Sequence, residues 1–249
     1  MPRANRYFTT GRNYHVTHRC HDRSFLLERV SDRDAYRKLL LEKLPEYPVQ
    51  LFGYCITSNH VHLLLQTESA EGVSALMQRV QGEFAQAYNR KKKRSGAFWG
   101  DRYHATLVDG DQYLMRCLRY IDLNMVRAGV VKHPRDWPWC GYDELAGIRK
   151  RYRLINRDGL LKSFWTPRSF PEFSKAYQAG IDELLAKNVA QDREPAWTES
   201  LAVGRSSFLS QVEATTKTKR RCTLEQQSDD LWVLREPSDA GISYRLKTT

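Results

Sequence analysis

The spacing of apolar positions in the first half of the chain changes repeatedly between the strand period of two and the helix period of about 3.6 residues. The pattern predicts elements in the order strand, helix, strand, strand, helix, strand, over 13–19, 32–44, 48–57, 60–66, 72–94 and 104–108. Ser31 is the expected cap of the first helix and Pro45 its stop. This order is typical of an α+β, ferredoxin-like split βαβ fold, with an antiparallel sheet and helices on one face.

The next segment, DGDQYLMRCLRYIDLNMVRAG, predicts a third helix, with Asp109 or Asp111 as its cap and Gly129 as its end. One stripe of this helix is apolar and belongs to the core: Leu114, Leu118, Ile121 and Met125. A second stripe places Tyr120 and Asn124 one helical turn apart, with their side chains on the same side.

The second half of the chain has weaker patterns. Residues 134–142 (PRDWPWCGY) indicate an aromatic-rich wrap that closes the first domain. A capping box, Ser169-Phe-Pro-Glu172, predicts a helix to about Lys187, and a shorter helix is expected near 206–215. No element is predicted for 223–249. We therefore expect three regions: a main domain, a connector and a mostly helical, basic accessory region, at 1–147, 148–168 and 169–249.

Composition and charge favour a nucleic-acid partner. The 249 residues carry a formal net charge of +11, concentrated in basic runs at 90–94, 149–153 and 217–221, and 11% of the residues are aromatic and could stack on bases. Basic runs are also common on ordinary solvated surfaces. No apolar stretch reaches the roughly 20 residues that span a bilayer, and the N-terminus lacks the apolar core of a signal peptide. Five scattered cysteines without a CxxC pair fit reduced thiols, so we expect a cytoplasmic protein.

The segment TSNHVHLLLQ carries the most specific chemistry. On a strand, His60 and His62 point to one face. Val61, Leu63 and Leu65 point to the other. Two neutral imidazoles at this spacing can converge on one divalent ion. The alternative is a pair of hydrogen-bonded or half-exposed histidines at the start of a strand, and an isolated HxH pattern leaves both open.

Tyr120 is the tyrosine that has a possible metal ligand close to it in the sequence. Among thirteen tyrosines it has an oxygen-bearing side chain, Asn124, one turn later on a helix. A metal at His60 and His62 would polarise a phosphodiester oxygen, and a tyrosine hydroxyl could attack phosphorus to form a covalent phosphotyrosine. Taken without that context, Tyr120 could equally be an aromatic ring packed beside the core stripe.

The motifs SNHVHLLL, RYIDLNMVRAGVV and DWPWCGY together resemble the tyrosine transposases of the HUH class (histidine, hydrophobic, histidine), and most closely the REP-associated tyrosine transposases, over roughly residues 1–147. The resemblance implies a single-strand endonuclease that cleaves and rejoins hairpin-associated DNA through a 5′-phosphotyrosine with Mg²⁺ or Mn²⁺. It implies Tyr120 as the nucleophile and His60, His62 and Asn124 as metal ligands. The sequence departs from the family pattern at Met125 and Cys140, where proline and serine are usual.

The same resemblance implies DNA contacts near the second helix, because family members recognise a hairpin close to the cleavage site. The residues concerned are Arg90, Lys91, Lys92, Lys93, Arg94, Phe98, Trp99 and Arg102. For the Phe98-Trp99 loop, a packed hairpin tip is an equal alternative. Members of the class often work as homodimers. A non-catalytic nucleic-acid-binding relative on the same fold, and a rolling-circle replication initiator of the same class, are the competing functions.

Overall fold

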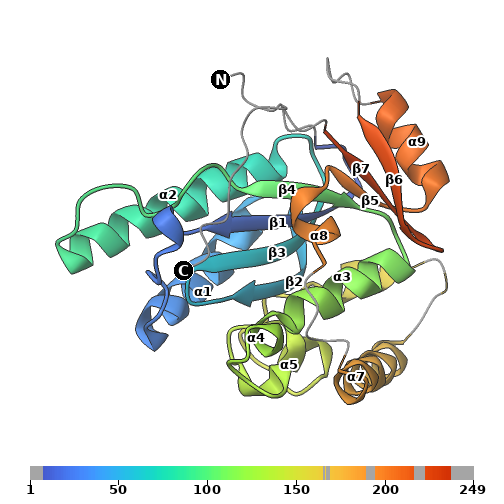
Figure 1. Cartoon of the computed structure of the whole chain (residues 1–249). Coiled ribbons are helices and arrows are strands. Elements are labelled where there is room, and N and C mark those ends of the chain that lie inside the picture. The colour runs from blue at the N-terminus through green and yellow to red at the C-terminus, as the bar shows by residue number, and fades with distance from the viewer. Residues whose placement is uncertain (1–7, 165, 167–168, 189–193, 216–221, 237–249) are drawn as a thin grey trace.

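A single mixed sheet forms the centre of the molecule (Figure 1). The computed structural model describes residues 8–164, 166, 169–188, 194–215 and 222–236. Within these residues the sheet has seven strands in the order β2-β3-β1-β4-β5-β7-β6. The elements are, in chain order, β1 (Asn13–Arg19), η1 (His21–Arg23), α1 (Val30–Lys43), η2 (Leu44–Glu46), β2 (Val49–Ile56), β3 (His60–Thr67), α2 (Gly72–Lys92), β4 (His104–Val108), α3 (Gln112–Asp122), α4 (Asn124–Arg127), η3 (Pro134–Asp136), α5 (Tyr142–Leu145), α6 (Arg157–Lys162), α7 (Phe170–Ala186), α8 (Ala196–Glu199), β5 (Ala202–Gly204), α9 (Ser206–Thr215), β6 (Thr223–Ser228) and β7 (Leu231–Arg235).

The first four strands and their helices confirm the predicted ferredoxin-like order. β1 lies between β3 and β4, β2 pairs with the far side of β3, and all three pairings are antiparallel. The helix ends differ slightly from the prediction. α1 begins at Val30, and its N-cap residue, Arg29, makes no side-chain hydrogen bond, so Ser31 is not the cap. α2 ends at Lys92, where Lys93 takes the left-handed conformation with φ 51°.

The C-terminal part of the chain extends the same sheet. β5 pairs in parallel with β4 through Leu107 and Ala202, β7 pairs with β5, and β6 forms the outer edge. The expected helices are present as α7, with its capping box at Ser169, and α9. The strands β5, β6 and β7 are additions that the sequence does not predict. β5 is only three residues long, and β6 (TLEQQS) is almost entirely exposed, so neither has an apolar alternation to detect.

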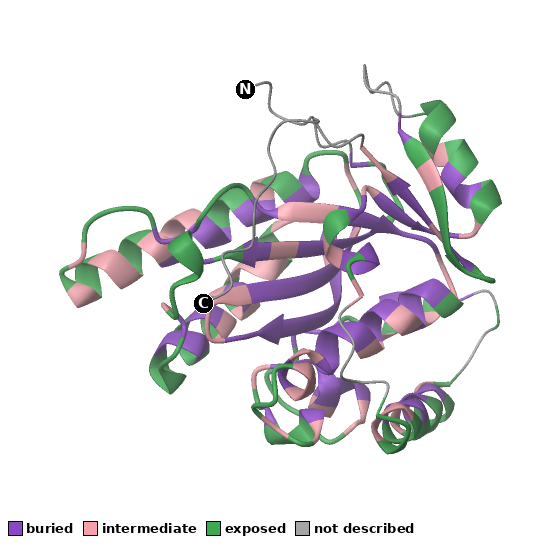
Figure 2. Cartoon of the chain, viewed as in Figure 1, coloured by how far each residue is buried: buried purple, intermediate pink, exposed green. Residues whose placement is uncertain are grey.

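The two faces of the sheet carry different layers. α1 and α2 pack on one face, and α3 packs on the other, as Figure 1 shows. Gly53 in β2 allows this close approach of α3, because a Cβ there would lie 2.7 Å from Cδ2 of Leu118. Figure 2 shows that the central strands and the sheet side of α3 are buried, whereas the far end of α2 is largely exposed. No helix among the described residues is long and apolar enough to cross a membrane.

The third predicted helix is broken into two. α3 ends at Asp122, and Leu123 (φ −76°, ψ 2°) turns the chain into the short α4, which begins at Asn124. Gly129, with φ +67°, ends this segment as predicted. The apolar stripe of Leu114, Leu118, Ile121 and Met125 is buried, so the core assignment is confirmed.

Glu144 holds the segment after α5 against the sheet. Its carboxylate is fully buried and accepts hydrogen bonds from the Tyr54 hydroxyl (2.9 Å), Arg37 Nη2 (3.2 Å) and the backbone N–H groups of Leu154 and Ile155 (2.8 and 2.9 Å). Arg149, from the second basic run, donates to the Tyr54 hydroxyl at 3.2 Å. This arginine therefore serves the fold. The predicted connector also contains α6, which lies against β2.

Asp122 links α3 to α7 and makes stability depend on pH. Its buried carboxylate accepts from the Tyr177 hydroxyl at 2.7 Å and from Gly141 N–H at 3.1 Å. Burial raises the pKa of Asp122 from 3.8 to about 7. Because the folded pKa lies above the unfolded value, the native state binds the proton more tightly, so the contribution to stability is greatest below about pH 4 and is lost as the pH rises through 7.

We expect Asp122→Asn to remove this pH dependence. An asparagine can still accept from Gly141 N–H and can donate to the Tyr177 oxygen, but it does not ionise. The free energy of unfolding of the variant, relative to that of the wild-type protein, should therefore increase as the pH rises from 5 to 8. Chemical denaturation of both proteins across this range measures the difference. A difference that stays constant with pH would contradict the assignment.

Candidate active site

One face of the sheet gathers histidines from three strands. Thr17 of β1 lies opposite His62 of β3 and His104 of β4, and Arg19 lies opposite His60. Because directly paired residues and those two positions away share a face, His15 lies on this side too. The face is the one that α3 covers. Tyr120 therefore approaches the same side of the sheet as the imidazoles, as predicted.

His62 lies at the centre of a chain of hydrogen bonds. Its Nδ1 is 2.9 Å from His15 Nε2, and its Nε2 is 3.0 Å from Asn124 Nδ2. His15 Nδ1 in turn lies 2.8 Å from the backbone oxygen of Trp197. The rings of His15 and His62 are inclined by only 11°, so the bond between them lies close to both ring planes, which is the favourable direction for a nitrogen lone pair.

The ring of His60 is also oriented by hydrogen bonds at its Nδ1 atom. Its Nδ1 lies 2.6 Å from Asn59 Oδ1 and 2.9 Å from Thr57 Oγ1. The amide oxygen can only accept, so His60 Nδ1 carries the proton and Nε2 keeps its lone pair. The rings of His60 and His62 are 4.7 Å apart between centroids. The first histidine of the pair is therefore prepared to act as a ligand through Nε2.

Tyr120 packs against this histidine cluster. Its ring centroid lies 5.9 Å from that of His15 and 6.2 Å from that of His62, both edge to face. The guanidinium of Arg127 lies over the ring at 4.0 Å, and its Nη2 donates to the Tyr120 backbone oxygen. The structure thus brings together Tyr120, Asn124 and His62, which the sequence analysis placed in one site.

Burial keeps the imidazoles neutral. It lowers the pKa of His15 to about 3, and it also lowers the pKa of His60 to about 3, with a further contribution from the charge of Arg19. The pKa of His62 is lowered well below its usual value by burial and then by its two neighbouring imidazoles. Arg127 lowers all three pKa values as well. Neutral imidazoles are the form that binds metal ions.

The residues present fit a divalent ion bound by few protein ligands. Within the described residues, no group of three His, Cys, Asp or Glu side chains has metal-binding geometry. The available donors are the Nε2 atoms of His60 and His62 and the amide oxygen of Asn124. Asn124 Nδ2 lies 3.0 Å from His62 Nε2, so the amide must turn for its oxygen to face the same ion. A carboxamide oxygen suits Mg²⁺ or Mn²⁺, and such ions keep open positions for water and phosphate oxygens.

Three residues of this site are not identified by the sequence analysis: His15, Arg127 and Trp197. Trp197 is fully buried, and its ring lies 6.2 Å from that of Tyr120. Strand alternation in NYHVTHR places His15 on a face, but only the pairing of β1 with β3 shows that it is the face of His62. Trp197 comes from a distant part of the chain, and nothing in its local sequence indicates the contact.

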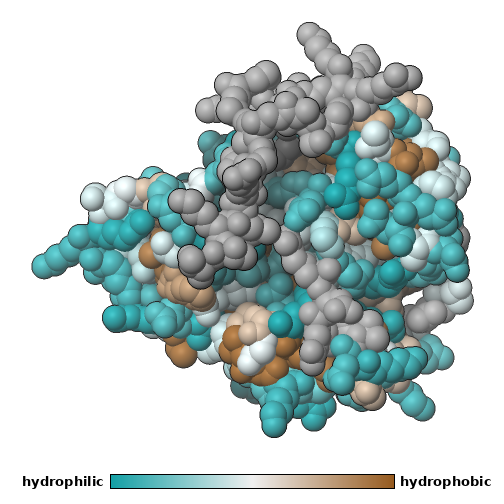
Figure 3. Space-filling model, viewed as in Figure 1, coloured by the Kyte–Doolittle hydropathy of each residue, from teal (hydrophilic) through white to brown (hydrophobic). Residues whose placement is uncertain are grey.

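The predicted DNA contacts divide into exposed and structural side chains. Four of these cations are exposed: Arg90, Lys91, Lys93 and Arg102. The first three lie at or just after the C-terminal end of α2, which extends from the body as a hydrophilic projection in Figures 1 and 3. Two cations of the run are used internally: Lys92 forms an ion pair with Asp32 at 3.1 Å, and Arg94 donates to Asn89 and to the backbone oxygen of Ala97.

Phe98 and Trp99 belong to a buried aromatic cluster with Phe84. The Trp99 indole donates to the backbone oxygen of Gln81 at 3.0 Å, and its ring stacks on His18 at 4.5 Å. This arrangement favours the packed hairpin tip, the alternative named for this loop, over stacking of these two rings on DNA bases.

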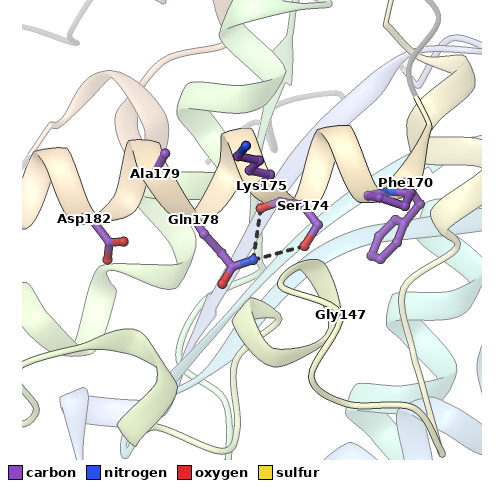
Figure 4. Close-up of a pocket in the computed structure, with 8 residues that line it drawn as sticks. Gly147, Phe170, Ser174, Lys175, Gln178, Ala179 and Asp182 are labelled. Atoms are coloured by element: carbon purple, nitrogen blue, oxygen red, sulfur yellow. Dashed lines mark hydrogen bonds between the residues drawn. The ribbon is translucent and has the colours of Figure 1, made fainter.

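A hollow on another part of the surface shares no residue with this site. It lies along α7 and is lined by Phe170, Ser174, Lys175, Gln178 and Asp182, with Gly147 opposite (Figure 4). Gln178 Nε2 donates to the oxygen atoms of Ser174 at 3.3 Å. The hollow contains no arrangement of groups suited to DNA cleavage.

Comparison with known proteins shows which family and fold the chain resembles. Residues 9–124, a segment that ends at Asn124, match the family model described as "Transposase IS200 like". A Haemophilus influenzae protein assigned as a REP-associated tyrosine transposase is 28% identical over 155 residues, covering 57% of this chain and 86% of its own. The solved structure of a REP-associated tyrosine transposase bound to a REP hairpin superposes with a TM-score of 0.51 at 20% identity, covering 60% of this chain and 89% of that one, and so shares the fold.

Proposed function

We propose that the protein cleaves and rejoins single-stranded DNA through a covalent bond to Tyr120, starting from the match of residues 9–124 to the IS200-like transposase family model. The observation that carries the proposal is the convergence of His60, His62, Asn124 and Tyr120 on one face of the sheet. The structural neighbour bound to a REP hairpin suggests a DNA hairpin as the substrate.

The proposed cleavage is a displacement at phosphorus. The Tyr120 oxygen forms a bond to the phosphorus as the bond to the 3′ oxygen of the preceding nucleotide breaks, which leaves a 5′-phosphotyrosine and a free 3′ hydroxyl. The phenolic proton passes from Tyr120 to water, and the departing 3′ oxygen takes up a proton from water, so one proton is released and one is consumed. Attack by a 3′ hydroxyl on the phosphotyrosine reverses the reaction and rejoins a strand without any other energy source.

The neighbouring side chains support this chemistry. Arg127, stacked on the ring of Tyr120, favours the phenolate through its positive charge. His60, His62 and Asn124 would hold Mg²⁺ or Mn²⁺, which would polarise the phosphodiester as a Lewis acid. The exposed cations of α2 (Arg90, Lys91 and Lys93) can bind the phosphates of the hairpin stem.

The test is to trap the covalent product. Purified protein is incubated with a fluorescent hairpin oligonucleotide that has single-stranded flanks, with Mg²⁺, Mn²⁺ or a chelator, and then denatured. We expect a labelled band at the mass of protein plus DNA with either metal and none with the chelator. Mass spectrometry should locate the DNA on the peptide that contains Tyr120. Binding of the hairpin without any adduct under all metal conditions would indicate a non-catalytic relative and reject the proposal.

A further inference from the structure

His15 is a buried histidine between the candidate metal ligand His62 and the C-terminal part of the chain. It is fully inaccessible to solvent, and each of its ring nitrogens has one partner. Nδ1 lies 2.8 Å from the backbone oxygen of Trp197, and Nε2 lies 2.9 Å from His62 Nδ1. The direction of these two hydrogen bonds determines where the protons are.

The carbonyl of Trp197 fixes the first proton. A carbonyl oxygen accepts and never donates, so His15 Nδ1 must carry a proton. A second proton on Nε2 would make His15 a fully buried cation, and neither of its two hydrogen-bond partners, the Trp197 carbonyl and His62, is an anion. His15 Nε2 therefore has a lone pair.

The lone pair of His15 fixes the second proton. His15 Nε2 accepts, so the proton between the two rings belongs to His62 Nδ1, and His62 Nε2 is left without one. The amide of Asn124 agrees with this assignment, since its Nδ2 points at His62 Nε2 from 3.0 Å and can donate to it. His62 consequently presents an Nε2 lone pair toward Asn124 and the side of the site where Tyr120 packs.

We propose that His15 is a positioning residue that transmits the hydrogen-bonding direction of the Trp197 carbonyl to His62 and holds His62 in its metal-binding tautomer. This inference rests on the proposed function of His62 as a ligand. It also assigns a role to the C-terminal part of the chain, because Trp197 lies beyond the 9–124 segment that matches the transposase family. His60 has a local equivalent in Asn59, whereas His62 depends on a residue 182 positions beyond His15.

Contacts of Thr106 and His104 hold the segment that carries this carbonyl. The Thr106 hydroxyl lies 3.1 Å from the Trp197 oxygen and 2.8 Å from the Ser200 oxygen, and His104 Nε2 lies 3.0 Å from the Ser200 oxygen. The segment around α8 is thus joined to β1 and β4 through buried side chains. Its position relative to His15 is therefore defined by several bonds.

The experiment compares two amide variants of His15 in the full-length protein. His15→Asn can keep the bond to Trp197 but is too short to reach His62, whereas His15→Gln can present an amide oxygen where Nε2 was and accept from His62 Nδ1–H. Each variant loses one of two buried hydrogen bonds, so their stabilities should be similar. Thermal unfolding of both proteins checks this.

The first readout is the tautomer of His62 in metal-free protein, measured by long-range ¹H–¹⁵N correlation with ¹⁵N-histidine labelling. His62 is identified by the signals lost in His62→Asn. We expect a proton on Nδ1 alone in the wild-type protein and in His15→Gln, and a population with the proton on Nε2 in His15→Asn. Unchanged Nδ1 protonation in His15→Asn would overturn the proposal.

The second readout is Mn²⁺ binding by calorimetry without DNA. We expect His15→Asn to bind about 10- to 100-fold more weakly than the wild-type protein, as for other residues that orient metal-ligating histidines, and His15→Gln to bind nearly as well. Equal weakening in both variants would mean that His15 acts only through packing and would also overturn the proposal. Adduct formation by the wild-type protein tests the proposed function separately, so the two ideas can fail independently.

Discussion

Tyr120→Phe should form no covalent DNA adduct. The substitution removes the one oxygen that the proposed reaction places on phosphorus, so the yield of adduct is expected to fall by about a thousandfold or more, below detection on a denaturing gel. Phenylalanine keeps the ring that packs edge to face on His15 and His62 and beneath Arg127. Hairpin binding, measured by fluorescence anisotropy, should therefore stay within about twofold of the wild-type value.

Tyr113→Phe is the matched control for this experiment. Tyr113 lies on the same helix, α3, and its hydroxyl donates to the backbone oxygen of Asp230 at 2.5 Å, away from the histidines. Loss of that hydrogen bond should cost about 1 kcal/mol of stability but leave adduct formation intact. A persistent adduct in Tyr120→Phe, or its loss in both variants, would show that another group attacks the phosphorus or that the assay reports only folding.

The local spacing of residues explains why half of the site is predictable from the sequence. Strand alternation fixes His60 and His62 on one face whatever the rest of the chain does. Helical spacing brings Tyr120 and Asn124 to one side. This survives the break at Leu123 because Leu123 N–H still bonds the Arg119 oxygen and the Leu123 oxygen still accepts from Arg127 N–H, as in a continuous helix. The remaining step, that α3 covers the histidine face, follows from the resemblance to a known family and not from spacing.

The other half of the site depends on long-range pairing, which no local pattern encodes. His15 meets His62 because β1 pairs with β3 in one register, and Trp197 arrives from a segment that the sequence assigns to an accessory region. The sequence pattern also fails to predict the strands β5 and β6. β5 has only three residues and takes its place between β4 and β7 by backbone pairing, and β6 forms the exposed outer edge, so neither segment shows an apolar alternation.

Charge runs are the least reliable part of the sequence interpretation, because an arginine or lysine can serve the fold as readily as a ligand. Lys92 pairs with Asp32, Arg94 binds the loop after α2, and Arg149 contacts Tyr54. Each of these partners is distant in sequence or is a backbone oxygen. The exposed cations that remain in the first run, Arg90, Lys91 and Lys93, are therefore the better candidates for DNA contacts.

Glu144 should be the most costly polar residue to replace. In Glu144→Ala the Tyr54 hydroxyl and the N–H groups of Leu154 and Ile155 lose a buried acceptor. Arg37 loses its carboxylate partner and keeps its bonds to Tyr54 and Tyr152. Removing one side of such a buried pair costs about 3–5 kcal/mol in free energy of unfolding. Chemical denaturation at pH 7 measures the loss.

Two further variants separate the effect of burying the Glu144 carboxylate from the effect of its charge. One replaces a surface carboxylate, and the other replaces Glu144 by an amide. Glu46→Gln removes a carboxylate that pairs with Lys43 at the surface, and its effect should be below about 0.5 kcal/mol. Glu144→Gln keeps one oxygen, which can accept from the N–H groups of Leu154 and Ile155, but its amide N–H groups then face Arg37. We expect an intermediate loss, because Arg37 then lacks the carboxylate of Glu144 while keeping its bonds to Tyr54 and Tyr152. A Glu144→Gln protein as stable as the wild type would mean that the carboxylate charge contributes nothing and that shape alone holds the segment on β2.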